Sequence, residues 1–170
     1  MPNHVHLIPT PHDADGIRRA LSKVHRTYAG HIHARMQRTG HFWQERFGCV
    51  PMDETHLEAA LRSVALNPAR ARLAKRAVDW RGSSVHDQLS HKRRGTLTDT
   101  APLRERYPDF AGLIESGEDE DLSMALRRAE TIGRPLGDTA FVEVLERRIA
   151  RILRPAKRGP KPQQTPKLEG

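Results

Sequence analysis

The chain has 170 residues and a formal net charge of +8 at pH 7. That length fits one ordinary domain, or a small domain with an appendage. The charge suits a polyanionic partner such as nucleic acid; a merely basic protein and an anionic membrane surface are the alternatives. No apolar run approaches the ~20 residues that span a bilayer, so we expect no membrane protein. The single Cys49 excludes a disulfide framework and a Cys-rich zinc cluster, and we expect a cytoplasmic protein.

Two histidines occupy alternate positions near the start of the chain. His4 and His6 flank Val5, and the apolar residues continue to Ile8, which predicts a short strand over residues 5–8. Alternate residues of a strand share a face, so the two imidazoles would stand side by side. Such a pair can bind a divalent metal ion. The alternative is a strand end that carries two exposed histidines.

Residues 17–36 have the spacing of one amphipathic helix, which Gly40 is expected to close. Its apolar stripe consists of Ile17, Leu21, Val24, Tyr28, Ile32 and Met36. Its other face carries Arg18, Arg19, Lys23, Arg26 and Arg35. We expect Tyr28 to pack in a core. The basic face is either simply solvated or contacts a phosphate backbone.

Aromatic and β-branched residues dominate residues 40–50, which predicts a second strand that ends at Pro51. Asp53 is predicted to cap the next helix, with His56 at the third helical position. That helix runs over residues 57–66, and Asn67-Pro68 should break or kink it, because proline lacks a donor and clashes with the preceding turn.

Four blocks in this order resemble a known family. They are Met-Pro-Asn-His-Val-His at 1–6, Thr-Gly-His-Phe-Trp-Gln-Glu-Arg-Phe at 39–47, Leu61-Arg62 with Leu-Asn-Pro-Ala-Arg-Ala at 66–71, and Trp80 with Ser83-Ser84. Together they resemble the IS200-like transposases, in particular the REP-associated tyrosine transposases. The resemblance implies an α+β, ferredoxin-like core over residues 1–85. It also implies metal-dependent cleavage and strand transfer of single-stranded DNA, hence DNA transposition and recombination.

The resemblance also implies a set of site residues. His4 and His6 match the metal ligands of the HUH motif, and Asn67 matches a third ligand, with Mg²⁺ or Mn²⁺ as the suitable ion. Positions 63 and 67 share one helical face, so such a metal would polarise a phosphate in front of position 63. The family's nucleophile is a tyrosine, whereas this chain has Ser63 there. A serine hydroxyl reaches less far and has no evident base beside it, so we expect no nicking by the tyrosine route.

The start of the chain departs from the family as well. In the family a strand and a helix precede the Met-Pro-Asn-His motif, so we expect a core that lacks its first strand and helix. A strand over residues 5–8 would then have an unpaired edge. A homodimer that pairs two such edges is one remedy.

Beyond residue 85 the composition changes. We expect a linker over 86–121, with a basic stretch at 90–95 and an acidic run at 118–121. A helical extension over 122–153 is predicted as two helices, 122–131 and 138–153. They are either a helix-turn-helix-like hairpin or a pair that packs on the main domain. Residues 154–170 are basic and rich in proline, which predicts a disordered tail.

Three functions remain open at this stage: a transposase-type nuclease, a catalytically inactive protein that binds single-stranded or hairpin DNA, and a metal-dependent hydrolase that uses water. For the DNA-binding function we expect salt-sensitive contacts to phosphates. The candidate residues are Arg18, Arg19, Lys23, Arg26, Arg46, Arg62, Arg70 and Arg72.

Overall fold

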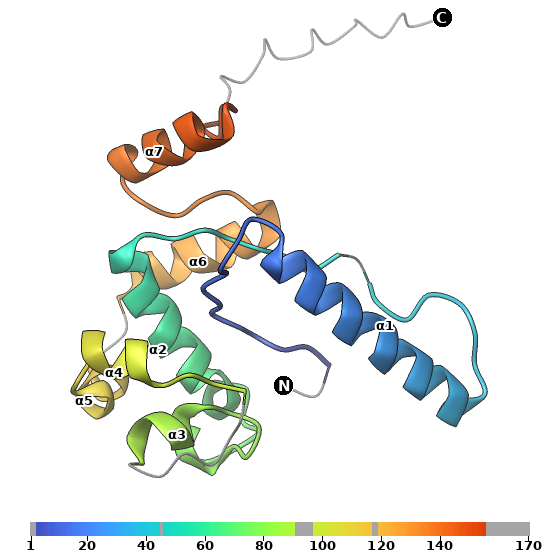
Figure 1. Ribbon diagram of the computed structural model, residues 1–170. Helices are drawn as coiled ribbons and strands as arrows, with labels where there is room; N and C mark the ends of the chain where they lie inside the picture. The colour runs from blue at the N-terminus through green and yellow to red at the C-terminus, as the bar shows by residue number, and fades with distance from the viewer. Residues whose placement is uncertain (1–2, 45, 91–96, 117–118, 156–170) are drawn as a thin grey trace, which may run out of the picture.

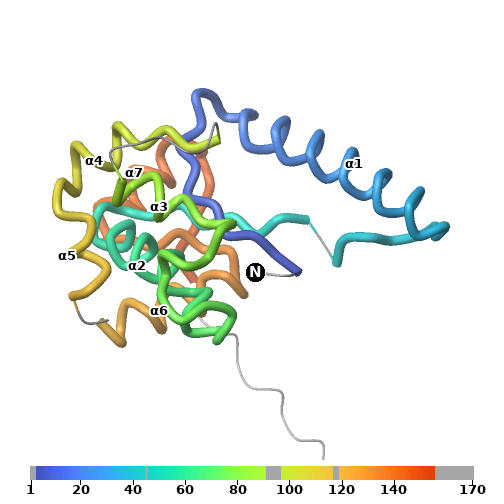
Figure 2. The backbone as a smooth tube through the Cα atoms, turned by 90° about the horizontal axis from the view of Figure 1, so that it is seen from below, coloured from blue at the N-terminus to red at the C-terminus, as the bar shows by residue number. Residues whose placement is uncertain are grey.

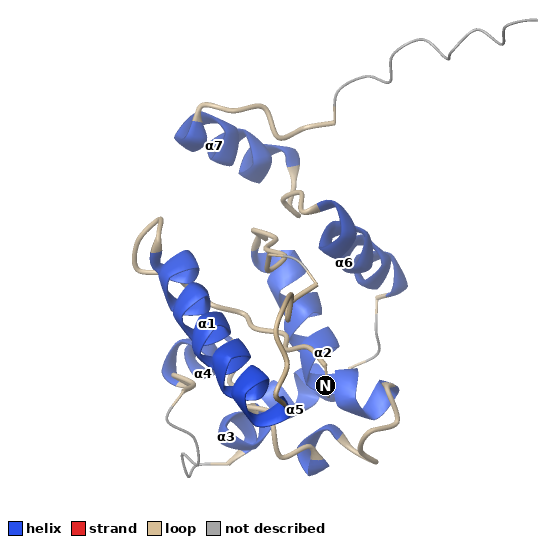
Figure 3. Ribbon diagram, turned by 90° about the vertical axis from the view of Figure 1, so that its right-hand side faces the viewer, coloured by secondary structure: helices blue, strands red, loops and turns tan. Residues whose placement is uncertain are grey.

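The computed structural model of the protein describes residues 3–44, 46–90, 97–116 and 119–155 (Figure 1). These residues form seven α-helices and one 3-10 helix, and they contain no β-sheet (Figure 3). In chain order the elements are α1 (Gly16–Met36), α2 (Glu54–Arg70), η1 (Ala77–Asp79), α3 (Val85–Leu89), α4 (Ala101–Arg106), α5 (Phe110–Glu115), α6 (Glu120–Ile132) and α7 (Thr139–Ile149). Most of the basic stretch at 90–95, and the predicted tail from residue 156 onward, lie outside the described residues.

The predicted α+β, ferredoxin-like fold is therefore wrong. Strands were predicted over residues 5–8 and 40–50, but residues 5–8, 40–44 and 46–50 are loops. An extended segment becomes a strand only where a neighbour pairs its backbone groups, and the one β-bridge among the described residues joins Met52 to Leu136. The exposed fractions of Val5 and Leu7 are 74% and 61%, so the apolar side chains of this segment do not enter a core. No sheet face is present in the described part of the chain to cover them.

The core of the molecule lies around α2, which contacts α5, α6 and η1. Small side chains, among them Ala59 and Ala65, are buried on α2 and let its neighbours approach closely. Ala65 joins Ala77, Val85 and Phe110 in one apolar cluster. The cluster gathers residues from four separate elements, so it fixes their arrangement.

The two ends of α2 follow from its sequence. The predicted N-cap is confirmed, because the Asp53 carboxylate accepts a hydrogen bond from the backbone N–H of His56 at 3.0 Å. The same carboxylate also accepts from the backbone N–H of Asp138 at 3.0 Å, which ties α2 to the start of α7. Asn67-Pro68 was expected to break or kink the helix; it does not break it, because α2 continues to Arg70. Pro68, which has no backbone N–H to donate, therefore lies in the last turn of α2.

Residues 86–121, expected to be a linker, contain α4 and α5 in full. α5 contributes Phe110, whose exposed fraction is 6%, to the core cluster. Asp109 caps α5 by accepting a hydrogen bond from the N–H of Gly112 at 2.9 Å. This segment thus belongs to the packed part of the molecule.

The predicted helix 17–36 is observed as α1, but it contains no buried residue. It projects away from the other helices, as Figure 2 shows. Val24 is 59% exposed and Tyr28 49% exposed, so the apolar stripe of α1 does not enter the core around α2. The helix ends before the expected Gly40, at Gln37, which adopts the left-handed conformation.

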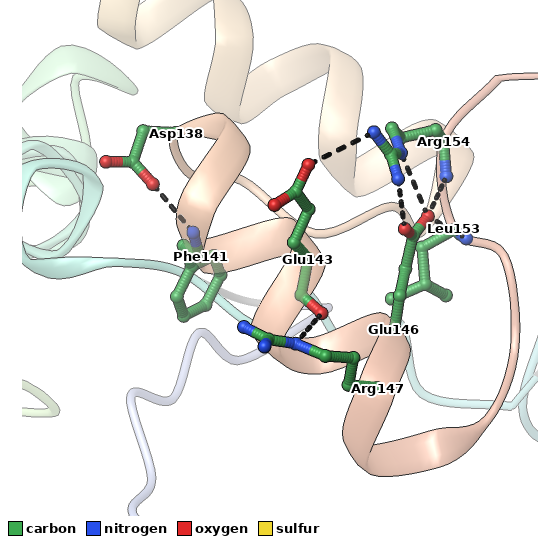
Figure 4. Close-up of polar contacts among 7 residues, drawn as sticks. All are labelled: Asp138, Phe141, Glu143, Glu146, Arg147, Leu153 and Arg154. Carbon is green, nitrogen blue, oxygen red and sulfur yellow. Dashed lines mark hydrogen bonds and ion pairs between the residues drawn. The ribbon is translucent and has the colours of Figure 1, made fainter.

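The two predicted C-terminal helices are observed as α6 and α7, but α7 ends at Ile149 and not at residue 153. Gly133 in the left-handed conformation ends α6. After α7 the chain turns back along the helix (Figure 4). There the Arg154 guanidinium donates to the Glu146 carboxylate at 2.8 Å and reaches Glu143 at 3.5 Å. Among the helices described, none has both the length and the apolar character needed to cross a bilayer.

Candidate nucleic-acid interface

A groove of about 670 Å³ lies between α1 and residues 40–47. α1 presents two adjacent ridges to it, each with a spacing of four residues, which places the members of a ridge on one helical face. The first ridge is Arg18, Ser22 and Arg26, and the second is His25, Ala29 and His33. The opposite wall comes from the loop and includes His41, Phe42, Trp43, Arg46 and Phe47.

Aromatic contacts hold the loop against α1. The Trp43 ring stacks on the His25 ring with centroids 4.2 Å apart and planes inclined by 25°. The Trp43 indole N–H also donates to the His25 carbonyl at 3.2 Å. Phe42 meets Tyr28 and His33 edge-on, with centroids 5.6 and 5.5 Å apart. Phe42 and Trp43 thus both turn toward one helix, whereas consecutive residues of a strand would point to opposite faces of a sheet.

The described residues that line the groove carry positive charge and no carboxylate. Arg18 is held in place by Asp15, whose carboxylate accepts from its Nη2 at 2.7 Å, and this hydrogen bond raises the pKa of the Arg18 guanidinium. Arg26 and Arg46 form no hydrogen bond or ion pair with any other described residue. Both guanidinium groups are exposed and able to bind an anion.

Three of the eight predicted DNA-binding residues, Arg18, Arg26 and Arg46, line this groove. Arg19 and Lys23 lie on exposed parts of α1 outside it, and Arg19 pairs with Asp13 at 2.6 Å. Three others lie elsewhere. They are Arg62 and Arg70 on α2, and Arg72 just beyond it.

Arg62 is buried and bonds to other residues of the fold. Its exposed fraction is 8%, and its Nε donates to the Leu113 carbonyl at 2.8 Å. Its Nη2 donates to Ser116 at 2.8 Å and to Glu58 at 3.0 Å. These bonds attach the end of α5 to α2, so the predicted phosphate contact by Arg62 conflicts with its burial.

The proposed metal ligands are only partly brought together. The rings of His4 and His6 lie 4.9 Å apart, edge to face, as alternate residues of an extended segment would. Burial lowers the pKa of His6, His4 adds to this effect, and Glu130 opposes it from 3.9 Å. Asn67 lies in the last turn of α2, and no hydrogen bond joins it to either histidine. Within the described ranges no three His, Cys, Asp or Glu side chains form a group that could hold a metal ion. That finding does not include asparagine, so an Mg²⁺ or Mn²⁺ site formed by His4, His6 and Asn67 stays a prediction.

Ser63 is half-buried on α2, one turn before Asn67. Its hydroxyl accepts a hydrogen bond from Arg70 Nη2 at 2.9 Å, and its carbonyl accepts another at 2.7 Å. Burial and the nearby Arg127 lower the pKa of the Arg70 guanidinium. No histidine or carboxylate among the described residues bonds to the Ser63 hydroxyl, and the absence of nicking by the tyrosine route stays a prediction.

Comparison with known proteins gives no relative: no family model, curated protein or solved structure matches this chain.

The aromatic and histidine residues of the groove were not predicted as site residues from the sequence. Trp43 and Phe42 were assigned to a strand, and Tyr28 to a core. A usable signal was present in His25 and His33, which lie eight residues apart on the helical face beside Arg18 and Arg26. The contact of that face with Trp43 spans 18 residues of chain and has no local sequence signature.

Proposed function

We propose that this protein binds single-stranded DNA, including the unpaired parts of hairpins, in the groove between α1 and residues 40–47. The observation that carries the proposal is that arginine and aromatic side chains line one open groove of about 670 Å³. Proteins that bind single strands combine a positive groove that follows the backbone with aromatic rings on which bases stack.

The stacking half of this binding mode is supported by Trp43. Its side chain is held by His25 through ring stacking and through the indole hydrogen bond, yet it remains 36% exposed. A ring that is fixed before binding loses little conformational freedom when a base stacks on it. Bases in a duplex are already stacked and cover each other's faces, so such a ring favours an unpaired strand.

The phosphate half is supported by Arg26 and Arg46. They lie on opposite walls of the groove, one on α1 and one on the loop. The net charge of +8 would add long-range attraction for a polyanion. Binding through such contacts releases counterions, so the affinity should fall as the salt concentration rises.

Cleavage of the bound strand, which the resemblance to IS200-like transposases implies, remains a prediction. The Ser63 hydroxyl accepts a hydrogen bond from Arg70, and no described histidine or carboxylate bonds to it. We therefore propose binding, and not strand transfer, as the activity of this chain.

The test is the affinity for a labelled single-stranded oligonucleotide of mixed sequence, measured by fluorescence anisotropy across a salt series. We expect Trp43→Ala to weaken binding by about 1–3 kcal/mol, the value of one stacked base. The double variant Arg26→Gln/Arg46→Gln should weaken binding and flatten the salt dependence by about 1.4 in the log–log slope, which is two contacts at about 0.7 each.

The matched control is Arg81→Gln/Arg148→Gln. It removes the same charge from two exposed positions outside the groove and should change the affinity far less. Equal losses in the two double variants would show attraction by net charge alone. A protein that binds duplex as tightly as single strand, or neither, would contradict the proposal.

A further inference from the structure

We infer that protons set the affinity of the groove, because three of its lining side chains are histidines: His25, His33 and His41. The groove would bind single-stranded DNA more tightly as the pH falls. This inference rests on the proposed function and adds the regulation of the same site. Histidine is the side chain whose charge ordinarily changes between pH 5 and 8.

These imidazoles line the groove together with arginines, whose positive charge does not change with pH in this range. His25 and His33 lie on one ridge of α1, and Arg18 and Arg26 lie on the adjacent ridge. His41 and Arg46 face them from the loop. The described residues that line the groove include no carboxylate, and Asp15, at the start of α1, is bonded to Arg18; Glu45 lies outside the described residues.

The histidines are also open to solvent protons. His41 is exposed, and His25 and His33 are half-buried. His25 lies flat against the Trp43 ring, and His33 lies edge-on to Phe42. His25 and His33 therefore lie beside rings on which a base could stack.

The sign of the effect follows from linkage. A bound phosphate favours the charged form of an imidazole beside it, so proton uptake and strand binding strengthen each other. At high pH the groove offers only its arginines. At low pH it offers up to three further cations. Each cation that neutralises one phosphate of a single strand steepens the log–log salt dependence by about 0.7, so three steepen it by up to about 2.

The experiment measures the affinity for one single-stranded oligonucleotide across a salt series at about pH 5.5 and about pH 8, on either side of the ordinary histidine range. We expect binding at both pH values, at least about tenfold tighter at the lower pH, with the steeper salt dependence there. In the variant His25→Gln/His33→Gln/His41→Gln the affinities at the two pH values should become nearly equal, because the groove histidines that gain charge are gone.

The control for general protonation is His12→Gln/His31→Gln, which removes two exposed histidines outside the groove and should keep the wild-type pH ratio. Equal affinity at both pH values, or a ratio that the groove variant retains, would overturn the inference while leaving the proposed function intact. Absence of binding at every pH would instead overturn the proposed function.

A second measurement is independent of the variants' folding. The ring signals of the histidines are followed by NMR as the pH is lowered, with and without the oligonucleotide. We expect the three groove signals to titrate at higher pH in the complex, while those of His12 and His31 stay unchanged. Identical titration of all signals in the free and bound protein would overturn the inference.

Discussion

The packed region around α2 and the open region around α1 use their side chains in opposite ways. α2 buries small apolar residues such as Ala59 and Ala65 against its neighbours, and even its Arg62 is turned inward. α1 buries none of its residues, although its sequence is just as amphipathic. Its partner is a loop that brings Phe42 and Trp43 to it.

A helix with a clear apolar stripe, such as α1, need not be a core helix. Burial of apolar area is the main source of folding free energy, and it is concentrated around α2. The aromatic rings of the α1 region remain accessible and stand beside cations. We therefore expect substitutions around α2 to change the stability of the fold, and substitutions around α1 to change the proposed ligand binding.

The largest effect is expected for Phe110→Ala, which empties the centre of the α2 cluster. The side chain is 6% exposed, and truncation of a buried phenylalanine costs about 3–5 kcal/mol in the free energy of unfolding. Phe42→Ala, the matched change in the α1 region, should cost about 1 kcal/mol because the ring is only half-buried. Urea denaturation of both variants is the measurement. Equal losses of stability would break the division between the two regions.

The next effect is that of Arg62→Ala. It removes the donors to the Leu113 carbonyl and to Ser116, and hydrogen bonds to a charged group are worth about 1.5–3 kcal/mol. We expect a loss of about 2–3 kcal/mol in unfolding free energy and little change in DNA affinity of the protein that remains folded. Arg26→Ala should do the reverse, weakening DNA binding while leaving urea denaturation unchanged. A large affinity loss with full stability in the Arg62 variant would restore it as a phosphate contact.

The helices were the predictable part of this fold. The three- and four-residue spacing of apolar side chains identified α1, and Asp53 located the start of α2. Residues 5–8 and 40–50 were misassigned because local sequence shows only that a segment can extend, whereas pairing depends on partners far along the chain. α4 and α5 have six residues each, too few to show a helical period.

The candidate site was predictable only in part, for the same reason. Arg18 and Arg26 were found because the polar face of a helix can be deduced from its spacing. The stacking of Trp43 on His25 depends on how the loop folds back, and no pattern in the sequence reports that contact.

A smaller effect is expected at the cap shared by α2 and α7. Asp53→Ala removes the acceptor for the backbone N–H groups of His56 and Asp138 and should cost about 1–2 kcal/mol in the free energy of unfolding. Asp53→Asn is the control, because an amide oxygen can still cap the helix. Thermal and urea unfolding give both values. An alanine variant as stable as the asparagine variant would show that the cap contributes nothing.

The smallest effect is a local one at the end of α7. The hydrogen bond from Arg154, followed by those from the backbone N–H groups of Leu153 and Arg154, lowers the pKa of Glu146 from 4.5 to about 2 (Figure 4). A folded-state pKa below the ordinary value means stabilisation that is fully present above about pH 4.5 and lost as the pH falls through about 2. Hydrogen exchange of the Leu153 and Arg154 amides should therefore accelerate in that window. In the variant Glu146→Gln, exchange of the Leu153 and Arg154 amides should not accelerate between about pH 4.5 and 2. If it still accelerates, a group other than Glu146 causes the transition.

The most direct test of the proposed binding site uses the emission of Trp43. In Trp80→Phe, the only other tryptophan is removed and Trp43 reports alone. We expect unlabelled single-stranded DNA to quench this emission, and the quenching to saturate with the affinity measured by anisotropy. Duplex DNA should quench it much less. Saturable DNA binding with unchanged Trp43 emission would place the strand elsewhere and contradict the account.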